Sequence, residues 1–136
     1  MKTLFTLILS LICMITVANE SAAIKSLTLD GQYLAERNIK CEVFLLRPDS
    51  TMKLTETIKS QRYFSVQLET SLSYVLKFTS KDAKVKYLYI PEVIPGKFIF
   101  SVDFASKSSA TLRYDEKTRK MKLEKTDRRK IPIREQ

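Results

Sequence analysis

Residues 63–69 read Tyr-Phe-Ser-Val-Gln-Leu-Glu, and they decide the fold class because every second side chain is apolar. Phe64, Val66 and Leu68 share one parity, and polar side chains alternate with them. Successive side chains of a β-strand point to opposite faces, so this alternation predicts a strand with one face buried and the other in water. The stretch is therefore expected to belong to a sheet that covers a hydrophobic core.

The same two-residue period recurs on both sides of this stretch and predicts most of the other strands. Turn-forming residues separate the runs about every ten residues, and no window carries a helical stripe. Short strands at this spacing are typical of an antiparallel sandwich or barrel, and we predict an all-β antiparallel β-sandwich. The other expected strands are residues 24–34, 39–46, 52–58, 73–79, 85–89 and 98–104.

A β-hairpin is expected to follow the last of these strands. Residues 110–115 and 120–124 alternate in the same way around a polar turn. We expect one apolar face across this hairpin, formed by Ala110, Leu112, Tyr114, Met121 and Leu123. The folded domain is thus expected to span residues 24–124, and residues 125–136 are expected to form a basic, flexible tail.

Two positions in the first strands carry specific expectations. Gly31 follows Asp30 inside the strand 24–34 and predicts a bulge or a sharp bend there. Cys41 lies on the apolar face of residues 39–46, a run that is apolar on both faces near its end. We therefore expect a central strand with a buried, inert thiol, with a reactive or intermolecular thiol as the alternative.

The first residues predict export. Lys2 precedes an apolar run at 4–17, and small residues follow that run, which is the order found in a secretory signal peptide. A membrane-spanning helix needs about 20 apolar residues, so a cleaved signal is favoured over a membrane anchor. Cleavage fits after Ala23 or after Ala18, and we expect residues 1–23 to be removed. The mature protein is then expected to be periplasmic or secreted, without a membrane span.

The charge balance points to anionic partners. The formal net charge is +9, and residues 113–136 contain ten Lys or Arg against five Asp or Glu. Such an excess can attract anionic polymers, lipid headgroups or acidic proteins. Alternating signs dilute the field along this segment, and Arg128, Arg129 and Lys130 form its true cluster. Three residues are too few for a nucleic-acid-binding arm, so we expect no nucleic-acid partner.

A proline-bounded loop at residues 91–96 is a second candidate contact site. Val93 and Ile94 lie between Pro91 and Pro95. Proline stiffens a loop, and apolar side chains on a stiff loop could meet a partner. Alternatively, Val93 and Ile94 cap one open end of the core.

Six segments carry a family resemblance: Leu27–Leu34, Ile39–Phe44, Tyr63–Leu68, Tyr74–Phe78, Lys97–Phe104 and Leu112–Asp115. They resemble the carboxypeptidase regulatory-like domains, which are transthyretin-like (prealbumin-like) β-sandwiches, and look like short exported members from Bacteroidetes-type bacteria. The resemblance implies a fold and not an activity. Arg62 stands where that family usually has Gly, and the histidines used by the enzymatic transthyretin-like hydrolases are missing.

No sequence motif predicts catalysis. The chain has no histidine, which is the commonest acid–base residue and the commonest metal ligand. It also lacks a G-x-S-x-G elbow, a Gly-rich phosphate loop and a paired-cysteine metal site. We therefore expect no catalytic residue, no cofactor, no bound metal and no enzyme activity.

Two functions are consistent with these features. The first is an exported module that mediates protein interaction or structural support by contacting a cell-envelope protein. The alternative is a binder of anionic surface polysaccharides or glycans, through the basic tail and the rings of Tyr63, Tyr87 and Tyr89. Polymer binding through Lys and Arg should weaken steeply with salt, whereas an apolar protein contact should persist.

Overall fold

The computed structural model describes residues 26–34, 38–105 and 108–133, and β-strands make up most of these residues. The expected signal segment, residues 1–23, lies outside the described residues. The strands are β1 (Ser26–Leu34), β2 (Ile39–Leu46), β3 (Met52–Ser60), β4 (Tyr63–Glu69), β5 (Ser73–Thr79), β6 (Val85–Ile90), β7 (Gly96–Asp103), β8 (Ser109–Asp115) and β9 (Lys120–Thr126). A 3₁₀ turn, η1 (Arg128–Lys130), follows β9. Within these described ranges, no helix is long and apolar enough to cross a membrane.

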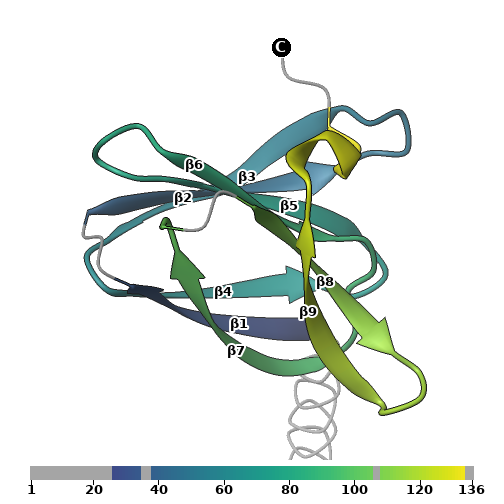
Figure 1. The fold of residues 1–136 in the computed structure, drawn as a ribbon. Coiled ribbons are helices and arrows are strands. Elements are labelled where there is room, and N and C mark those ends of the chain that lie inside the picture. Colours follow the sequence, from purple (N-terminus) through teal and green to yellow (C-terminus); the bar gives the residue numbers. More distant parts are fainter. Residues whose placement is uncertain (1–25, 35–37, 106–107, 134–136) are drawn as a thin grey trace, which may run out of the picture.

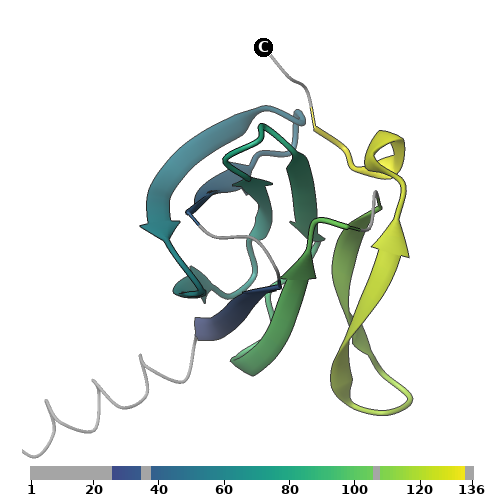
Figure 2. The same cartoon turned by 60° about the vertical axis from the view of Figure 1, so that its left-hand side comes forward.

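The strands form two sheets that pack face to face, as expected for a β-sandwich (Figure 1). The smaller sheet has the order β4-β1-β7, and the larger sheet has the order β3-β2-β5-β6-β8-β9. The larger sheet is wider, so β8 and β9 extend beyond the smaller sheet, and Figure 2 shows this hairpin standing apart from the rest of the sandwich. Both candidate binding surfaces described below lie where the larger sheet extends beyond the smaller one.

The prediction that the sandwich is wholly antiparallel is wrong. β1 pairs with β7 in parallel, and so does β6 with β8. Parallel neighbours need a crossover connection, and β7 supplies it between β6 and β8 by passing through the opposite sheet. Alternation along a strand shows which face is buried but does not show the direction of its neighbour, so the sequence pattern could not reveal these two pairings.

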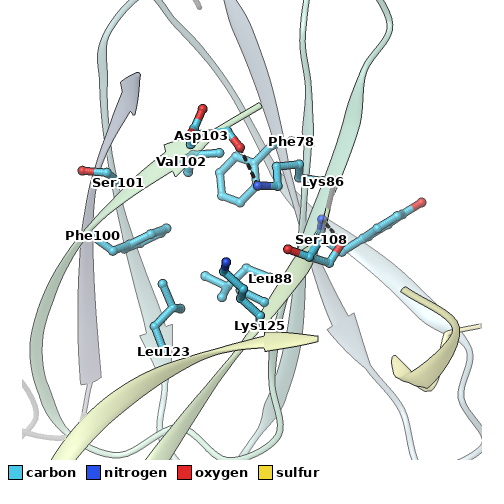
Figure 3. A pocket seen from close by; sticks show the side chains of 13 residues that line it. Phe78, Lys86, Leu88, Phe100, Ser101, Val102, Asp103, Ser108, Leu123 and Lys125 are labelled. Carbon is cyan, nitrogen blue, oxygen red and sulfur yellow. Dashed lines mark hydrogen bonds between the residues drawn. The ribbon is translucent and has the colours of Figure 1, made fainter. Parts of the chain in front are cut away.

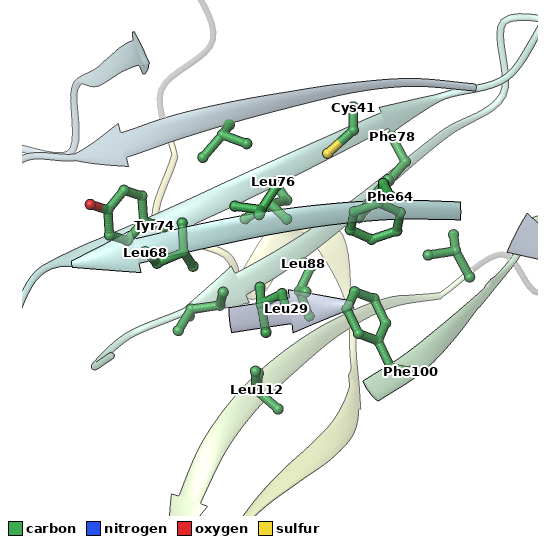
Figure 4. Packing of buried hydrophobic residues seen from close by; sticks show 14 of the residues in the cluster. Leu29, Cys41, Phe64, Leu68, Tyr74, Leu76, Phe78, Leu88, Phe100 and Leu112 are labelled. Carbon is green, nitrogen blue, oxygen red and sulfur yellow. The ribbon is translucent and has the colours of Figure 1, made fainter. Parts of the chain in front are cut away.

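The core fills the space between the two sheets (Figure 4). Phe64, Val66 and Leu68 of β4 are all buried, as their alternation predicts. An aromatic cluster occupies one end, where the Phe64 ring lies 5.3 Å from Phe78 and 5.5 Å from Phe100 between centroids. Burial of this apolar surface is the main stabilising contribution to such a domain.

Gly31 makes room for the Phe64 ring and does not bend its strand. β1 pairs with β4 without interruption from Ser26 to Gln32, so the predicted bulge or bend is wrong. Gly31 lies opposite Phe64 on one side and opposite Phe100 on the other. A Cβ added here would come closer than 3.0 Å to the Phe64 ring, a separation that real Cβ atoms do not show. The glycine is therefore required by packing.

Cys41 is a buried core residue, as predicted. It lies on β2, which is central because β3 and β5 pair with its two sides. The side chain has no exposed surface and forms no disulfide with any described residue. Burial is the main reason that the pKa of its thiol rises from 9.0 to about 12, and the negative charges of Glu56 and Glu42 add to this effect. The thiol is therefore protonated at neutral pH, which supports the expected inert thiol over the reactive alternative.

The C-terminal segment, residues 125–133, was expected to be flexible or loosely docked but folds back onto the outer face of the larger sheet. β9 continues to Thr126, and η1 follows directly. Ile131 is 4% exposed and packs with Val75 and Tyr87, which are buried on that outer face. Val75 and Tyr87 present apolar surface on this outer face, and Ile131 and Ile133 of the C-terminal segment help to cover it.

We expect Ile131→Ala to lower the free energy of unfolding by about 2 kcal/mol, the lower part of the range for truncating a buried aliphatic side chain. Urea denaturation followed by circular dichroism measures the change. Ile133→Ala is the matched control, because Ile133 touches the same cluster but is only partly buried. Equal effects of less than about 0.5 kcal/mol for both variants would show that the tail does not dock.

Candidate binding surfaces

The two apolar residues of the loop at 91–96 lie in different places, with Val93 in the core and Ile94 partly exposed. Val93 is 2% exposed, and its backbone bonds to Leu72 and Ser71 hold it against the end of the sandwich. It therefore caps the core, which was the alternative interpretation, and is closed to a partner. Ile94 is partly exposed and lines a shallow pocket with Phe98 and Tyr114.

The predicted basic cluster lies on the η1 turn, and two of its cations are held in place. The Arg128 guanidinium lies 5.1 Å from the centre of the Tyr87 ring, a cation–π contact. Asp127 caps the turn by accepting a 3.0 Å hydrogen bond from the Arg129 backbone N–H, and its carboxylate pairs with the Arg129 guanidinium at 3.2 Å. The bond from the Arg129 backbone is the largest cause that lowers the pKa of Asp127. Lys130 lines a groove beside these residues.

The β8–β9 hairpin and η1 form one exposed cationic surface, which we call the hairpin surface. Residues 113–130 hold nine Lys or Arg and four Asp or Glu, a net charge of +5. Nearly all of these side chains are exposed, and Figures 1 and 2 show the hairpin at the end of the larger sheet. Arg113 and Glu124 pair at 3.7 Å, but both are about half exposed, so this ion pair adds little stability.

The aromatic side chains proposed for sugar stacking lie in three different environments. Tyr63 is 66% exposed on the outer face of the smaller sheet. Tyr87 is buried beneath the C-terminal segment, so its ring is closed to a sugar. Tyr89 is partly buried near the same segment. The three rings therefore do not form one stacking platform, and only Tyr63 offers a well-exposed face.

A cleft opens where the larger sheet extends past β7, and we call it the β7–β9 cleft (Figure 3). Its volume is about 290 Å³. The floor is apolar and comes from both sheets, with Phe78 and Leu88 on one side and Phe100 on the other. Leu123 adds apolar surface on the β9 wall and is 39% exposed. Such a cleft can take a small ligand with an apolar part.

Two lysines face this cleft from strand positions that normally carry apolar residues. Lys86 precedes the buried Leu88 on the inner face of β6, and Lys125 follows Leu123 on the inner face of β9. The Lys86 ammonium donates a hydrogen bond to the backbone carbonyl of Asp103. Burial is the main cause that lowers the pKa of Lys86, the charge of Lys125 lowers it further, and the Asp103 carboxylate opposes both effects.

These lysines could not be found by sequence reasoning. Lys86, Asp103 and Lys125 are far apart along the chain, and only the fold brings them together. In addition, Val85, Tyr87 and Tyr89 form an apolar alternation along β6, but the core face of this strand carries the even-numbered residues. Tyr87 faces the opposite side, where the C-terminal segment covers it.

Neither a metal centre nor a catalytic constellation emerges from the described part of the chain. Residues 26–34, 38–105 and 108–133 contain no group of three or more His, Cys, Asp or Glu that could hold a metal ion. Asp30 accepts a 2.7 Å hydrogen bond from Ser65 and pairs with Lys97 at 3.2 Å. The Ser65 bond is the largest cause that lowers the Asp30 pKa, so this carboxylate is ionised at neutral pH.

Comparisons with known proteins add no function. No protein-family model matches the chain, and no curated protein matches it. Among solved structures, the chain is similar to the NMR structure of a protein from Eubacterium rectale, with 12% sequence identity and a TM-score of 0.34. The match covers 76% of this chain and 90% of that chain. A TM-score this low carries no argument about fold type or activity.

Proposed function

We propose that this protein is an exported, non-enzymatic module of the cell envelope that binds anionic surface polymers through the hairpin surface. The observation that carries the proposal is the net charge of +5 on the exposed hairpin that forms one end of the larger sheet. A long anion can approach such a projecting element from several sides, and closely spaced cations raise its local concentration. The signal-like pattern of residues 1–23 supports export.

We also propose that the sandwich is of the transthyretin-like type and that the protein turns over no substrate. The segment resemblance to carboxypeptidase regulatory-like domains supports the first point, and the absence of histidine from the sequence supports the second. A purified mature protein that hydrolysed a substrate would contradict the second point.

Contact with an envelope protein is the second candidate function, and one observation favours it. β7 is an end strand of the smaller sheet, and its Ile99 is 72% exposed on the outer face. An end strand can pair with a strand of another protein, and an exposed apolar side chain next to that edge would add buried area. This contact would persist at high salt.

Salt dependence of binding tests the first candidate. We expect the mature protein to bind a linear polyuronate at 50 mM NaCl and to lose most of that affinity by 300 mM, because screening weakens contacts between exposed charges. Isothermal titration calorimetry over a salt series measures the loss. Affinity that does not change with salt would contradict the proposal.

Charge removal at the hairpin tip tests where the polymer binds. The variant Lys117→Gln/Lys120→Gln/Lys122→Gln should weaken polyuronate binding about tenfold or more. The matched control Lys53→Gln/Lys59→Gln/Lys81→Gln removes the same charge from exposed positions outside the hairpin and should weaken binding far less. Equal losses would show that total charge, and not the hairpin surface, determines binding.

In-cell crosslinking distinguishes the two candidates. Mass spectrometry of an envelope fraction washed at high salt should recover no protein partner if the hairpin surface binds polymer. Recovery of one salt-resistant protein that is lost with Ile99→Asp, but retained in the hairpin-tip variant, would favour the protein contact at β7.

A further inference from the structure

The β7–β9 cleft combines an apolar floor with two lysine side chains. A groove that is only a gap between two sheets is not expected to have this combination. The floor of the cleft presents Phe78, Leu88 and Phe100, while Lys86 and Lys125 enter it from inward-facing positions on β6 and β9. Alternating patterns normally place apolar residues at such positions, because the inner face of a sandwich is its core. Two lysines at the same opening therefore indicate a role other than packing.

The charges around the cleft favour an anion. Asp103 is the carboxylate among the lining residues, against the two lysine ammonium groups. Its side chain accepts a 2.9 Å hydrogen bond from the Ala105 backbone N–H, so it is engaged in its own turn. Lys125 forms no ion pair with any residue of the described ranges. Figure 3 shows its nitrogen atom pointing into the space beside Leu88 and Phe100.

The two ammonium groups gain from an anion between them. Lys86 loses part of its hydration through burial, which lowers its pKa; the Asp103 carboxylate offsets part of this effect, and the positive charge of Lys125 adds to it. An anionic group at the mouth of the cleft would restore favourable interactions for both. The apolar floor below them would be left for a non-polar part of the same ligand.

We propose that the β7–β9 cleft binds a small amphiphilic anion, with its carboxylate between Lys86 and Lys125 and its apolar body on Phe78, Leu88 and Phe100. The cleft volume of about 290 Å³ is at the lower end for small-molecule sites, which begin at about 300 Å³. At about 30 Å³ for each water-sized group, it accommodates roughly ten non-hydrogen atoms. A medium-chain carboxylic acid fits this size, whereas a complete lipid does not.

Octanoate is the probe for this site. We expect saturable binding of octanoate to the full mature protein in two-dimensional NMR, with methyl shifts at Leu88, Val102 and Leu123, which all line the cleft. Leu54 on β3 is exposed and distant from the cleft lining, so its methyl signals should not move. Octanol, which has the same chain without the charge, should bind about tenfold more weakly or worse.

Matched lysine variants test the role of the charges. Lys125→Gln should weaken octanoate binding about tenfold, because it removes one charge-assisted contact. Lys122→Gln is the control, since Lys122 lies three residues earlier on β9 with its side chain on the opposite face and removes the same charge. Both lysines are exposed, so thermal unfolding should be unchanged in both variants.

Three outcomes would overturn the proposal. Octanol binding as tightly as octanoate would show that the lysines do not recognise a charge. Equal weakening by Lys125→Gln and Lys122→Gln would indicate diffuse attraction to a basic protein. Absence of saturable binding, or shifts confined to residues outside the cleft, would exclude the site. Polymer binding is tested separately, by the salt dependence of polyuronate affinity and by the triple variant at the hairpin tip.

Discussion

Gly31→Ala is expected to destabilise the protein by about 3 kcal/mol or more, although it adds a single methyl group. The new Cβ would overlap the ring of Phe64, which packs over the backbone of β1. That ring cannot move away easily, because Tyr33, Phe78 and Phe100 surround it. Overpacking of a dense core typically costs about 1–3 kcal/mol, and a clash with a ring held on three sides belongs at the upper end or above it.

Denaturation in urea measures the effect of Gly31→Ala, and two further variants make its cause testable. Gln32→Ala changes the next residue of β1, which is exposed, and should alter stability by less than about 0.5 kcal/mol. Phe64→Leu removes part of the ring and gives the added methyl group space. The double variant Gly31→Ala/Phe64→Leu should therefore be at least about 1 kcal/mol more stable than the sum of the single effects predicts. Strict additivity would show that the Phe64 ring is not the obstacle.

Local periodicity in the sequence predicts much of this fold, because it depends only on which side chains of a strand face the core. β4 and β5 begin and end at the predicted residues, and Leu112 and Leu123 pair across the predicted final hairpin. The central position of β2 also follows from its apolar character on both faces. These features need no knowledge of distant parts of the chain.

Features that depend on distant segments were missed for one common reason: the residues that determine them are far apart in sequence. The parallel partner of β1 is β7, and nothing within either strand specifies that direction. Tyr87 has the appearance of a core residue of the sandwich, but it belongs to a second cluster that exists only because Ile131 returns to the outer face. The lysines of the β7–β9 cleft are separated in the same way.

The same separation in sequence explains why some candidate contact residues are exposed in the structure and others are buried. Val93 is apolar and next to prolines, and those facts suit a core cap as well as a contact loop. Its burial follows from hydrogen bonds to the turn after β4, which the sequence does not reveal. Arg128, Arg129 and Lys130 lie on the surface as predicted, yet their positions are set by Asp127 and Tyr87.

Alkaline pH is expected to destabilise the fold strongly, and Cys41 is the main cause up to about pH 10. Its thiol has a pKa of about 12 in the folded protein against 9.0 for an ordinary thiol, mainly because of burial. Between these two values the unfolded chain releases the proton and the folded protein keeps it, so unfolding becomes more favourable as the pH rises. Below pH 9 both states are protonated and the contribution to stability is fully present.

The expected loss follows from the size of this pKa difference. Each pH unit between 9 and 12 costs about 1.4 kcal/mol, so raising the pH from 8 to 10.5 should lower the free energy of unfolding by about 2 kcal/mol through Cys41. Above pH 10 the buried Tyr33 adds to the effect, because burial first and the neighbouring Cys41 second raise the pKa of its hydroxyl. Urea denaturation at several pH values measures the slope.

Cys41→Ala separates the thiol from every other alkaline effect. The variant should be less stable than the wild type at pH 7, because it removes a fully buried sulfur atom from the core. Its stability should then fall less steeply between pH 9 and 10, where Tyr33 is still protonated in both states. For Tyr33→Phe we expect the opposite pattern. Its free energy of unfolding should fall with pH as steeply as that of the wild type up to pH 10, and less steeply above pH 10. If the stability of Cys41→Ala falls as steeply as that of the wild type between pH 9 and 10, the fold does not hold the thiol protonated. Repulsion between charges across the protein, or the titration of lysines, must then account for the alkaline transition.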